Sequence, residues 1–141
     1  MTIESALLLW VTGALVGSMV FFGAIVAPKV FQALPPEHAG AFLRSFFPSY
    51  YLWGLVIASA STAIALWASW PVFLACSAVL VLFAYARQIL MPKINAARDA
   101  QLRGDQGAGR HFDRLHLRSV FINGLQLLAL LAAASLVVWS G

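Results

Sequence analysis

Residues 50–86 read YYLWGLVIASASTAIALWASWPVFLACSAVLVLFAYA, and this uncharged stretch decides the fold. It divides at the link Ala68-Ser69-Trp70-Pro71 into two apolar runs, 50–70 and 71–86. The second run extends to Met91 because Arg87 is long enough to direct its charge toward the membrane surface. About 20 apolar residues cross the hydrocarbon core of a bilayer as a helix. The short link therefore predicts an antiparallel hairpin of two transmembrane helices.

Two further apolar runs lie on either side of this hairpin, at 6–27 and 117–139. The chain is 62% hydrophobic and only 10% charged, whereas soluble domains carry about a quarter charged residues. Only helices and closed barrels satisfy their backbone hydrogen bonds inside a membrane. The sequence predicts an all-α, polytopic membrane protein: a single domain over 1–141 that forms a four-transmembrane-helix bundle, with spans at about 6–27, 50–70, 71–91 and 117–139.

The basic residues are distributed very unevenly between the apolar runs. All nine lie between the first and second runs or around the link between the third and fourth: Lys29, Arg44, Arg87, Lys93, Arg98, Arg103, Arg110, Arg114 and Arg118. Short loops rich in lysine and arginine stay on the cytoplasmic side of a membrane. We therefore expect an inner-membrane protein with cytoplasmic basic loops and with both termini outside, in the periplasm. Anionic lipid headgroups are the expected partner of these charges, and no nucleic-acid recognition motif is present.

The segment after the first span contains a helix break and then an amphipathic pattern. Pro35 and Pro36 end any helix that continues from the first span, and Pro36 suits the first position of a new helix. The apolar residues that follow recur at helical spacing: Ala39, Phe42, Leu43, Phe46 and Phe47. This pattern predicts an interfacial amphipathic helix between spans one and two.

Glycines and one charged pair predict further local features. Gly13 and Gly17 are four residues apart on the first span, and we expect them to allow close contact with another helix of the same chain. After the third span, Asp99 and Arg103 have the spacing of a helical ion pair. Glycines at 104, 107 and 109 predict the turn that leads back into the fourth span.

The last helix carries a polar stripe that reaches into the membrane. Phe112, His116, Ser119, Asn123 and Gln126 fall within an arc of about 80° on a helix. Polar side chains at such depth usually face the interior of the protein. Two interpretations remain open, namely hydrogen bonds that join helices and a functional polar pocket. The candidate binding cluster at the inner mouth combines this stripe with residues from the other segments: His38, Arg44, Tyr50, Arg98, His116, Ser119, Asn123 and Gln126.

The sequence offers little for catalysis or for metal binding. No carboxylate lies inside any of the four runs, and no nucleophile motif is present. The three histidines, His38, His111 and His116, show no spacing typical of metal ligands. We therefore expect no catalytic residues and no cofactor. A haem or metal site made by His38 and His116 remains the alternative that the residues allow.

Several motifs resemble those of the transmembrane protein 205-like family, small four-span membrane proteins that contain a domain of unknown function. The motifs are Phe22-Gly23, Leu34-Pro35-Pro36-Glu37-His38-Ala39-Gly40, Phe46-Phe47-Pro48-Ser49-Tyr50-Tyr51, and the series Pro92, Arg98, Phe112, His116, Ser119 and Asn123. The resemblance implies the same four-helix fold, with signature positions His38, Pro48, Tyr50, His116, Ser119 and Asn123. The family is also distantly similar to the CopD-like membrane proteins, some of which handle copper or haem. This chain differs from them in having no histidine in its first three spans.

Three hypotheses for function follow from these patterns. The first is non-enzymatic binding, or transport-related handling, of a small solute or an anionic lipid at the cytoplasmic-side cluster. The second is a haem- or metal-binding redox protein of CopD-like type. The third is a structural or assembly subunit of a membrane complex, in which the polar stripe only joins helices. Transport through so small a chain would require a homo-oligomer or a partner membrane protein.

Overall fold

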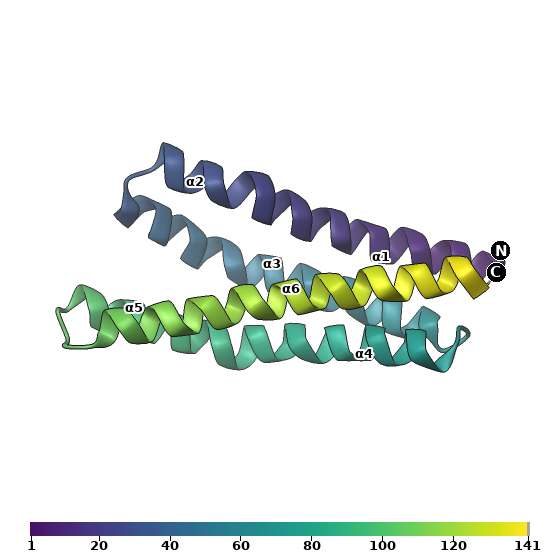
Figure 1. The fold of residues 1–141 in the computed structure, drawn as a ribbon. Helices are drawn as coiled ribbons and strands as arrows, with labels where there is room; N and C mark the ends of the chain where they lie inside the picture. The colour runs from purple at the N-terminus through teal and green to yellow at the C-terminus, as the bar shows by residue number, and fades with distance from the viewer. Residues whose placement is uncertain (141) are drawn as a thin grey trace.

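The protein consists of long antiparallel helices, as a computed structural model shows for residues 1–140 (Figure 1). No strand occurs among these described residues. Two of the helical rods contain a short π-helical segment, which leaves each rod continuous. The elements in chain order are α1 (Ile3–Phe21), η1 (Phe22–Val26), α2 (Ala27–Ala33), α3 (Pro36–Ala65), α4 (Trp70–Tyr85), η2 (Ala86–Leu90), α5 (Met91–Leu102) and α6 (Ala108–Ser140).

Three of these rods are long and apolar enough to cross a membrane. They are Ile3–Ala33, Trp70–Leu102 and Ala108–Trp139. The chain is therefore an all-helical protein with the character of a multi-pass membrane protein. Residues 50–65 of the expected second span lie within α3, a helix of 30 residues that runs antiparallel to its neighbours α1 and α4. The span ends earlier than expected, because residues 66–69 form the link and Trp70 begins α4.

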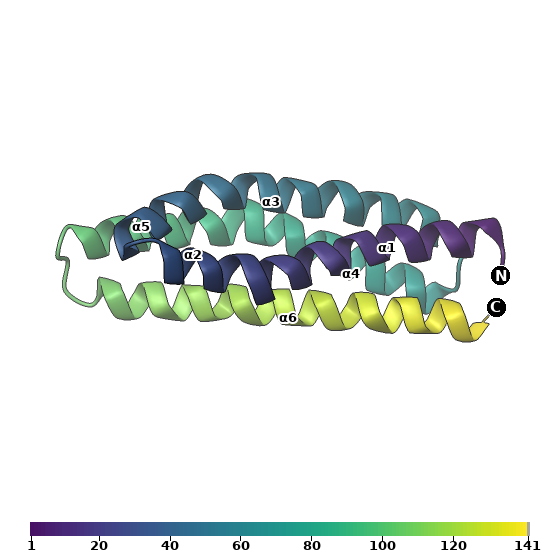
Figure 2. The same cartoon turned by 90° about the horizontal axis from the view of Figure 1, so that it is seen from above.

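The helices are arranged so that α1 and α4 each contact both α3 and α6. Figure 2 shows α3 and α6 on opposite sides of the molecule. Both termini lie at one end, and the α2–α3 junction and the α5–α6 turn lie at the other (Figure 1). We call this second end the basic end, because all nine lysines and arginines belong to the segments that lead to it.

The helix ends follow the local signals of the sequence. As expected, α2 ends before Pro35 and α3 begins at Pro36. The turn between α5 and α6 uses Gly104 at φ +83° and Gly107 at φ +79°, a region of backbone conformation that side chains with a Cβ rarely adopt. Gly109, also expected in the turn, instead belongs to α6 and lies against the Gln101 side chain of α5.

The predicted interfacial helix between spans one and two is not a separate helix in the structure. Residues 36–65 form one continuous helix, with Pro48 inside it. A proline within a helix costs about 3 kcal/mol because it removes a hydrogen bond and crowds the preceding turn. Aromatic pairs on both sides of Pro48, each contributing about 0.5–1.5 kcal/mol, act against this cost. Phe22 of η1 stacks on Phe46, with ring centroids 4.9 Å apart, and contacts Tyr50 at 5.0 Å.

The two π-helical segments share a cause that is visible in the sequence. Each is followed, after one residue, by a proline: Pro28 after η1 and Pro92 after η2. The wider turn is closed by hydrogen bonds from the Ala27 amide to the Phe22 carbonyl and from the Met91 amide to the Ala86 carbonyl. A π-turn accommodates a proline because the ring clashes with the carbonyl four residues earlier in an ordinary α-helix.

The prediction that Gly13 and Gly17 contact another helix of the chain is wrong. Both are exposed, and a Cβ at either position would meet nothing within 4 Å. The inward face of α1 is made instead by Leu8, Thr12, Leu15 and Met19. A glycine does allow close packing between α3 and α4, where Gly54 faces the Phe83 ring.

Candidate functional site

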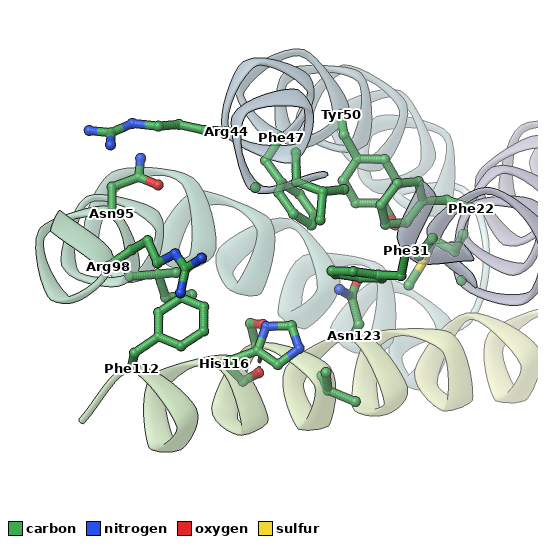
Figure 3. A pocket seen from close by; sticks show the side chains of 18 of the residues that line it. Phe22, Phe31, Arg44, Phe47, Tyr50, Asn95, Arg98, Phe112, His116 and Asn123 are labelled. Atoms are coloured by element: carbon green, nitrogen blue, oxygen red, sulfur yellow. Dashed lines mark hydrogen bonds between the residues drawn. The ribbon is translucent and has the colours of Figure 1, made fainter. Parts of the chain in front are cut away.

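A cavity of about 620 Å³ lies at the basic end of the molecule (Figure 3). Residues of six helical segments line it, namely α1, η1, α2, α3, α5 and α6. Cavities of this size are typical of sites for small organic molecules. Most of the residues that line it are apolar, and the polar ones are few: Arg44, Tyr50, Asn95, Arg98, His116, Ser119 and Asn123.

One wall of the cavity is a cluster of aromatic rings. Phe22 lies at its centre and contacts Phe46, Phe47 and Tyr50, with ring centroids 4.9 to 5.5 Å apart. Tyr51 stacks on Phe47 at 5.5 Å and contacts Phe83 of α4 at 6.4 Å. Because Gly54 leaves room for Phe83, the close packing of α3 on α4 supports this aromatic wall from behind.

The opposite wall carries a cation stacked on an aromatic ring. The Arg98 guanidinium lies over the Phe112 ring, with its Cζ 5.6 Å from the ring centroid. The His116 ring lies nearly parallel to that of Phe112, with centroids 6.0 Å apart. Arg98 donates a hydrogen bond of 2.6 Å to Gln101, and no carboxylate in the described part of the chain pairs with it. A positive charge at the cavity wall is thus left without a counter-charge.

The second arginine of the cavity is already paired. Arg44 of α3 donates to both carboxylate oxygens of Asp99 on α5, at 2.5 and 3.0 Å. This pairing raises the pKa of Arg44 above its usual value because the carboxylate accepts hydrogen bonds from the charged guanidinium. The expected Asp99–Arg103 pair is wrong, since Arg103 pairs with Asp105 instead. The long-range pair joins α3 to α5 beside the cavity and leaves Arg98 as the available cation.

The polar stripe of α6 divides between the cavity and the core. Ser119 lines the cavity and donates its hydroxyl to the His116 carbonyl at 2.8 Å. Asn123 also lines the cavity, and its Oδ1 atom is buried without a hydrogen-bond partner. Gln126 lies deeper, fully buried, and does not line the cavity; both polar atoms of its carboxamide lack partners.

The structure brings together most of the residues that the sequence nominated. Arg44, Tyr50, Arg98, His116, Ser119 and Asn123 all line the cavity, whereas His38 and Gln126 do not. His38 is exposed on the first turn of α3, so the pairing of His38 with His116 finds no support in this cavity. Among residues 1–140, no three histidine, cysteine or acidic side chains are grouped as metal ligands.

Several cavity residues were not nominated from the sequence. Phe31 and Phe47 contribute apolar walls to the cavity. Asp99 does not line the cavity, but it holds Arg44, which does. The apolar periodicity of 39–47 already included Phe47, but nothing local shows that it faces a cavity. Asp99 lies far from Arg44 in the sequence. Ion pairs on one helix form between residues three or four positions apart, so the sequence pointed to Arg103, four residues after Asp99, as its partner.

The fold and the cavity define a helical protein with three rods that are able to cross a membrane and a pocket at its basic end. Residues 10–103 match the family model described as domain of unknown function (DUF4149), and the chain belongs to this family. The match contains the cavity-lining segments of η1, α2, α3 and α5, and it ends before α6. No curated protein and no solved structure matches the chain. The finer resemblance to the transmembrane protein 205-like and CopD-like proteins stays a prediction.

Proposed function

We propose that the protein binds an anionic amphiphile, a molecule with an apolar tail and a negatively charged headgroup, in the cavity at its basic end. The observation that carries this proposal is the position of Arg98, an arginine without a carboxylate partner on the wall of a mainly apolar cavity. Guanidinium groups bind phosphates and carboxylates through paired hydrogen bonds. The aromatic wall around Phe22 suits the apolar tail.

The proposal includes the topology that the sequence predicts. In it, α3 is a fourth span, the basic end faces the cytoplasm, and the protein lies in the inner membrane. Exposed tryptophans at the other end, Trp67, Trp70 and Trp139, support a membrane interface at that end, because tryptophan favours both membrane interfaces; the side that each end faces rests on the basic residues. The exposed Arg110, Arg114 and Arg118 on α6 then lie near anionic headgroups of the inner leaflet.

The depth of the cavity fits an amphiphile of the inner leaflet. From the end of α6, His116 lies about 36 Å and Asn123 about 25 Å along the helix, at 1.5 Å per residue. The hydrocarbon core is about 30 Å thick. A cavity that includes both residues therefore runs from headgroup level into the apolar region, as a lipid does.

The cavity also has a side from which such a molecule can enter. Neither η1 nor α2 buries a single residue, and α2 packs on α3 and η1 rather than on α6. Figure 1 shows α2 diverging from α6 toward the basic end. Phe31 of α2, which lines the cavity, is 58% exposed. Entry from the bilayer between α2 and α6 needs no passage through the protein core.

Binding of two probes to the purified protein in dodecyl maltoside tests the proposal. The probes are oleoyl lysophosphatidic acid and monoolein, which share tail and glycerol but differ in the phosphate. We expect the phosphate probe to bind more tightly, and Arg98→Gln to weaken its binding at least about tenfold, since a charged hydrogen bond contributes about 1.5–3 kcal/mol.

The matched control is Arg103→Gln, which removes the same charge. Arg103 directly follows the last residue of α5 and does not line the cavity. The variant should leave the affinity for lysophosphatidic acid within about twofold of wild type, a change below about 0.5 kcal/mol. Equal effects of the two substitutions, or equal affinity for monoolein and lysophosphatidic acid, would refute the proposed function.

A further inference from the structure

His116 faces the same part of the cavity as Arg98. The Arg98 Cζ atom and the centre of the His116 ring lie 5.6 and 6.0 Å from the centroid of the Phe112 ring. Figure 3 shows the guanidinium and the imidazole converging on the space beside Phe112. His116 is exposed, and its ring nitrogens form no hydrogen bond with residues 1–140. An anion bound between the two side chains lies within the distance of about 10 Å over which charges act in dilute salt.

The cavity contains a single group whose charge changes near neutral pH. Between about pH 5.5 and pH 8, histidine gains or loses a proton, and His116 is the only histidine that lines the cavity. Arg44 and Arg98 stay positive throughout this range, and Tyr50 stays neutral. The lining residues of α1, η1 and α2 are uncharged, and α4 and η2 contribute none. The charge that the cavity presents to a ligand therefore depends on His116.

Two carboxylates near the cavity keep their charge over the same range. Asp99 on α5 is paired with Arg44. Asp113 lies three residues before His116 on α6, does not line the cavity, and forms no ion pair among residues 1–140. Its constant charge acts on His116 with and without a ligand. Neither carboxylate therefore makes ligand binding depend on pH.

We infer that His116 is a second ligand of the headgroup that acts when protonated, so that the anionic amphiphile and a proton bind cooperatively. In the free protein the charge of Arg98 disfavours protonation of His116, because like charges repel. An anionic headgroup between them favours it: the imidazole takes a proton from the solvent and donates an N–H to the headgroup. The added attraction is present at low pH and is lost as the pH rises through the range in which histidine titrates. This inference rests on the proposed function.

A probe of fixed charge tests the coupling. The phosphodiester of oleoyl lysophosphatidylglycerol carries one negative charge throughout this range, so the protein alone titrates. We expect the wild-type protein in dodecyl maltoside to bind it at least about fivefold more tightly at about pH 5.5 than at about pH 8, since couplings between two ligands are about 5- to 150-fold. Calorimetry in two buffers of different ionisation enthalpy should show that binding takes up part of a proton.

Two substitutions on α6 locate the proton. His116→Gln keeps a polar side chain that does not titrate, so it should bind the probe with equal affinity at both pH values and take up no proton. His111→Gln is the matched control, because His111 is an exposed histidine of the same helix that does not line the cavity. It should retain the full pH dependence.

The outcomes separate this inference from the proposed function. Equal affinity of wild type at the two pH values, with the Arg98→Gln effect on lysophosphatidic acid still present, overturns the coupling and leaves the anion site. A pH dependence that survives in His116→Gln, or that disappears in His111→Gln, overturns the assignment to His116. If neither anionic probe binds, the inference and the proposed function fail together. The wild-type comparison depends on no variant, so it decides the coupling even if His116→Gln does not fold.

Discussion

Gly54 is a position in α3 at which the packing against α4 leaves no room for a side chain. A Cβ atom there would lie 2.5 Å from Cδ1 and 2.7 Å from Cζ of Phe83, far inside van der Waals contact. Phe83 is fully buried and is held from the side by Tyr51. Gly54→Ala must therefore displace either the Phe83 ring or α3 itself, and the aromatic wall of the cavity with it.

The size of the effect follows from two opposing contributions. Overpacking a well-packed core costs about 1–3 kcal/mol. Replacing glycine by alanine inside a helix recovers up to about 1 kcal/mol through helix propensity. Gly17→Ala on α1 supplies the second contribution alone, since a Cβ at that exposed position meets nothing within 4 Å. The difference in the free energy of unfolding between the two variants should thus be about 1–3 kcal/mol.

Thermal unfolding in dodecyl maltoside, followed by intrinsic tryptophan fluorescence, measures this difference. Gly54→Ala should unfold at a lower temperature than wild type, and Gly17→Ala at the same or a higher temperature. Adding Phe83→Leu to Gly54→Ala should recover part of the loss, because the smaller side chain makes room for the new methyl group. Equal unfolding temperatures for the two glycine variants would refute the reasoning. So would a double variant whose loss of stability exceeds the sum of the losses in the two single variants.

Three further predictions concern charge, burial and topology. Asp99→Asn should release Arg44 toward the cavity and tighten lysophosphatidic acid binding several-fold. The loss of stability should stay below about 1 kcal/mol, because the Arg44–Asp99 pair is largely exposed. Weaker binding of lysophosphatidic acid by this variant would contradict the prediction. Gln126→Met should raise the unfolding temperature, since it removes a fully buried carboxamide without partners; a marked fall in that temperature would show that the carboxamide is stabilising. The topology can be tested with single cysteines in a Cys76→Ala background and a membrane-impermeant maleimide. Gln106→Cys should react only from the cytoplasmic side, and Ser69→Cys only from the outer side. Labelling of both cysteines from one side would exclude the proposed topology.

Local features of the chain could be predicted because local chemistry determines them. The apolar runs, the break at Pro35-Pro36, and the short link at 68–71 all correspond to helices or helix ends in the structure. Gly104 and Gly107 adopt the left-handed backbone that their position in a tight turn requires. Each of these depends on residues within a few positions of one another, so the order of the chain contains the necessary information.

The candidate site was only partly predictable. The spacing of His116, Ser119 and Asn123 placed them on one helical face, and all three line the cavity. The same spacing included Gln126, which turns into the core instead. A stripe of residues covers about a third of the circumference of a helix. The packing of the neighbouring helices decides which part of that face lines a cavity and which part is buried.

The contacts between distant segments were decided by tertiary structure alone. In a soluble helix the apolar stripe shows which face is buried, but in a lipid-facing helix both faces are apolar and the stripe is lost. The sequence therefore could not show that Gly13 and Gly17 face away from the other helices, or that Gly54 faces Phe83. It could not assign Asp99 to Arg44 either. The rotation of each helix about its axis is set by how all the side chains fit together, and that fit leaves Arg98 unpaired at the edge of a cavity.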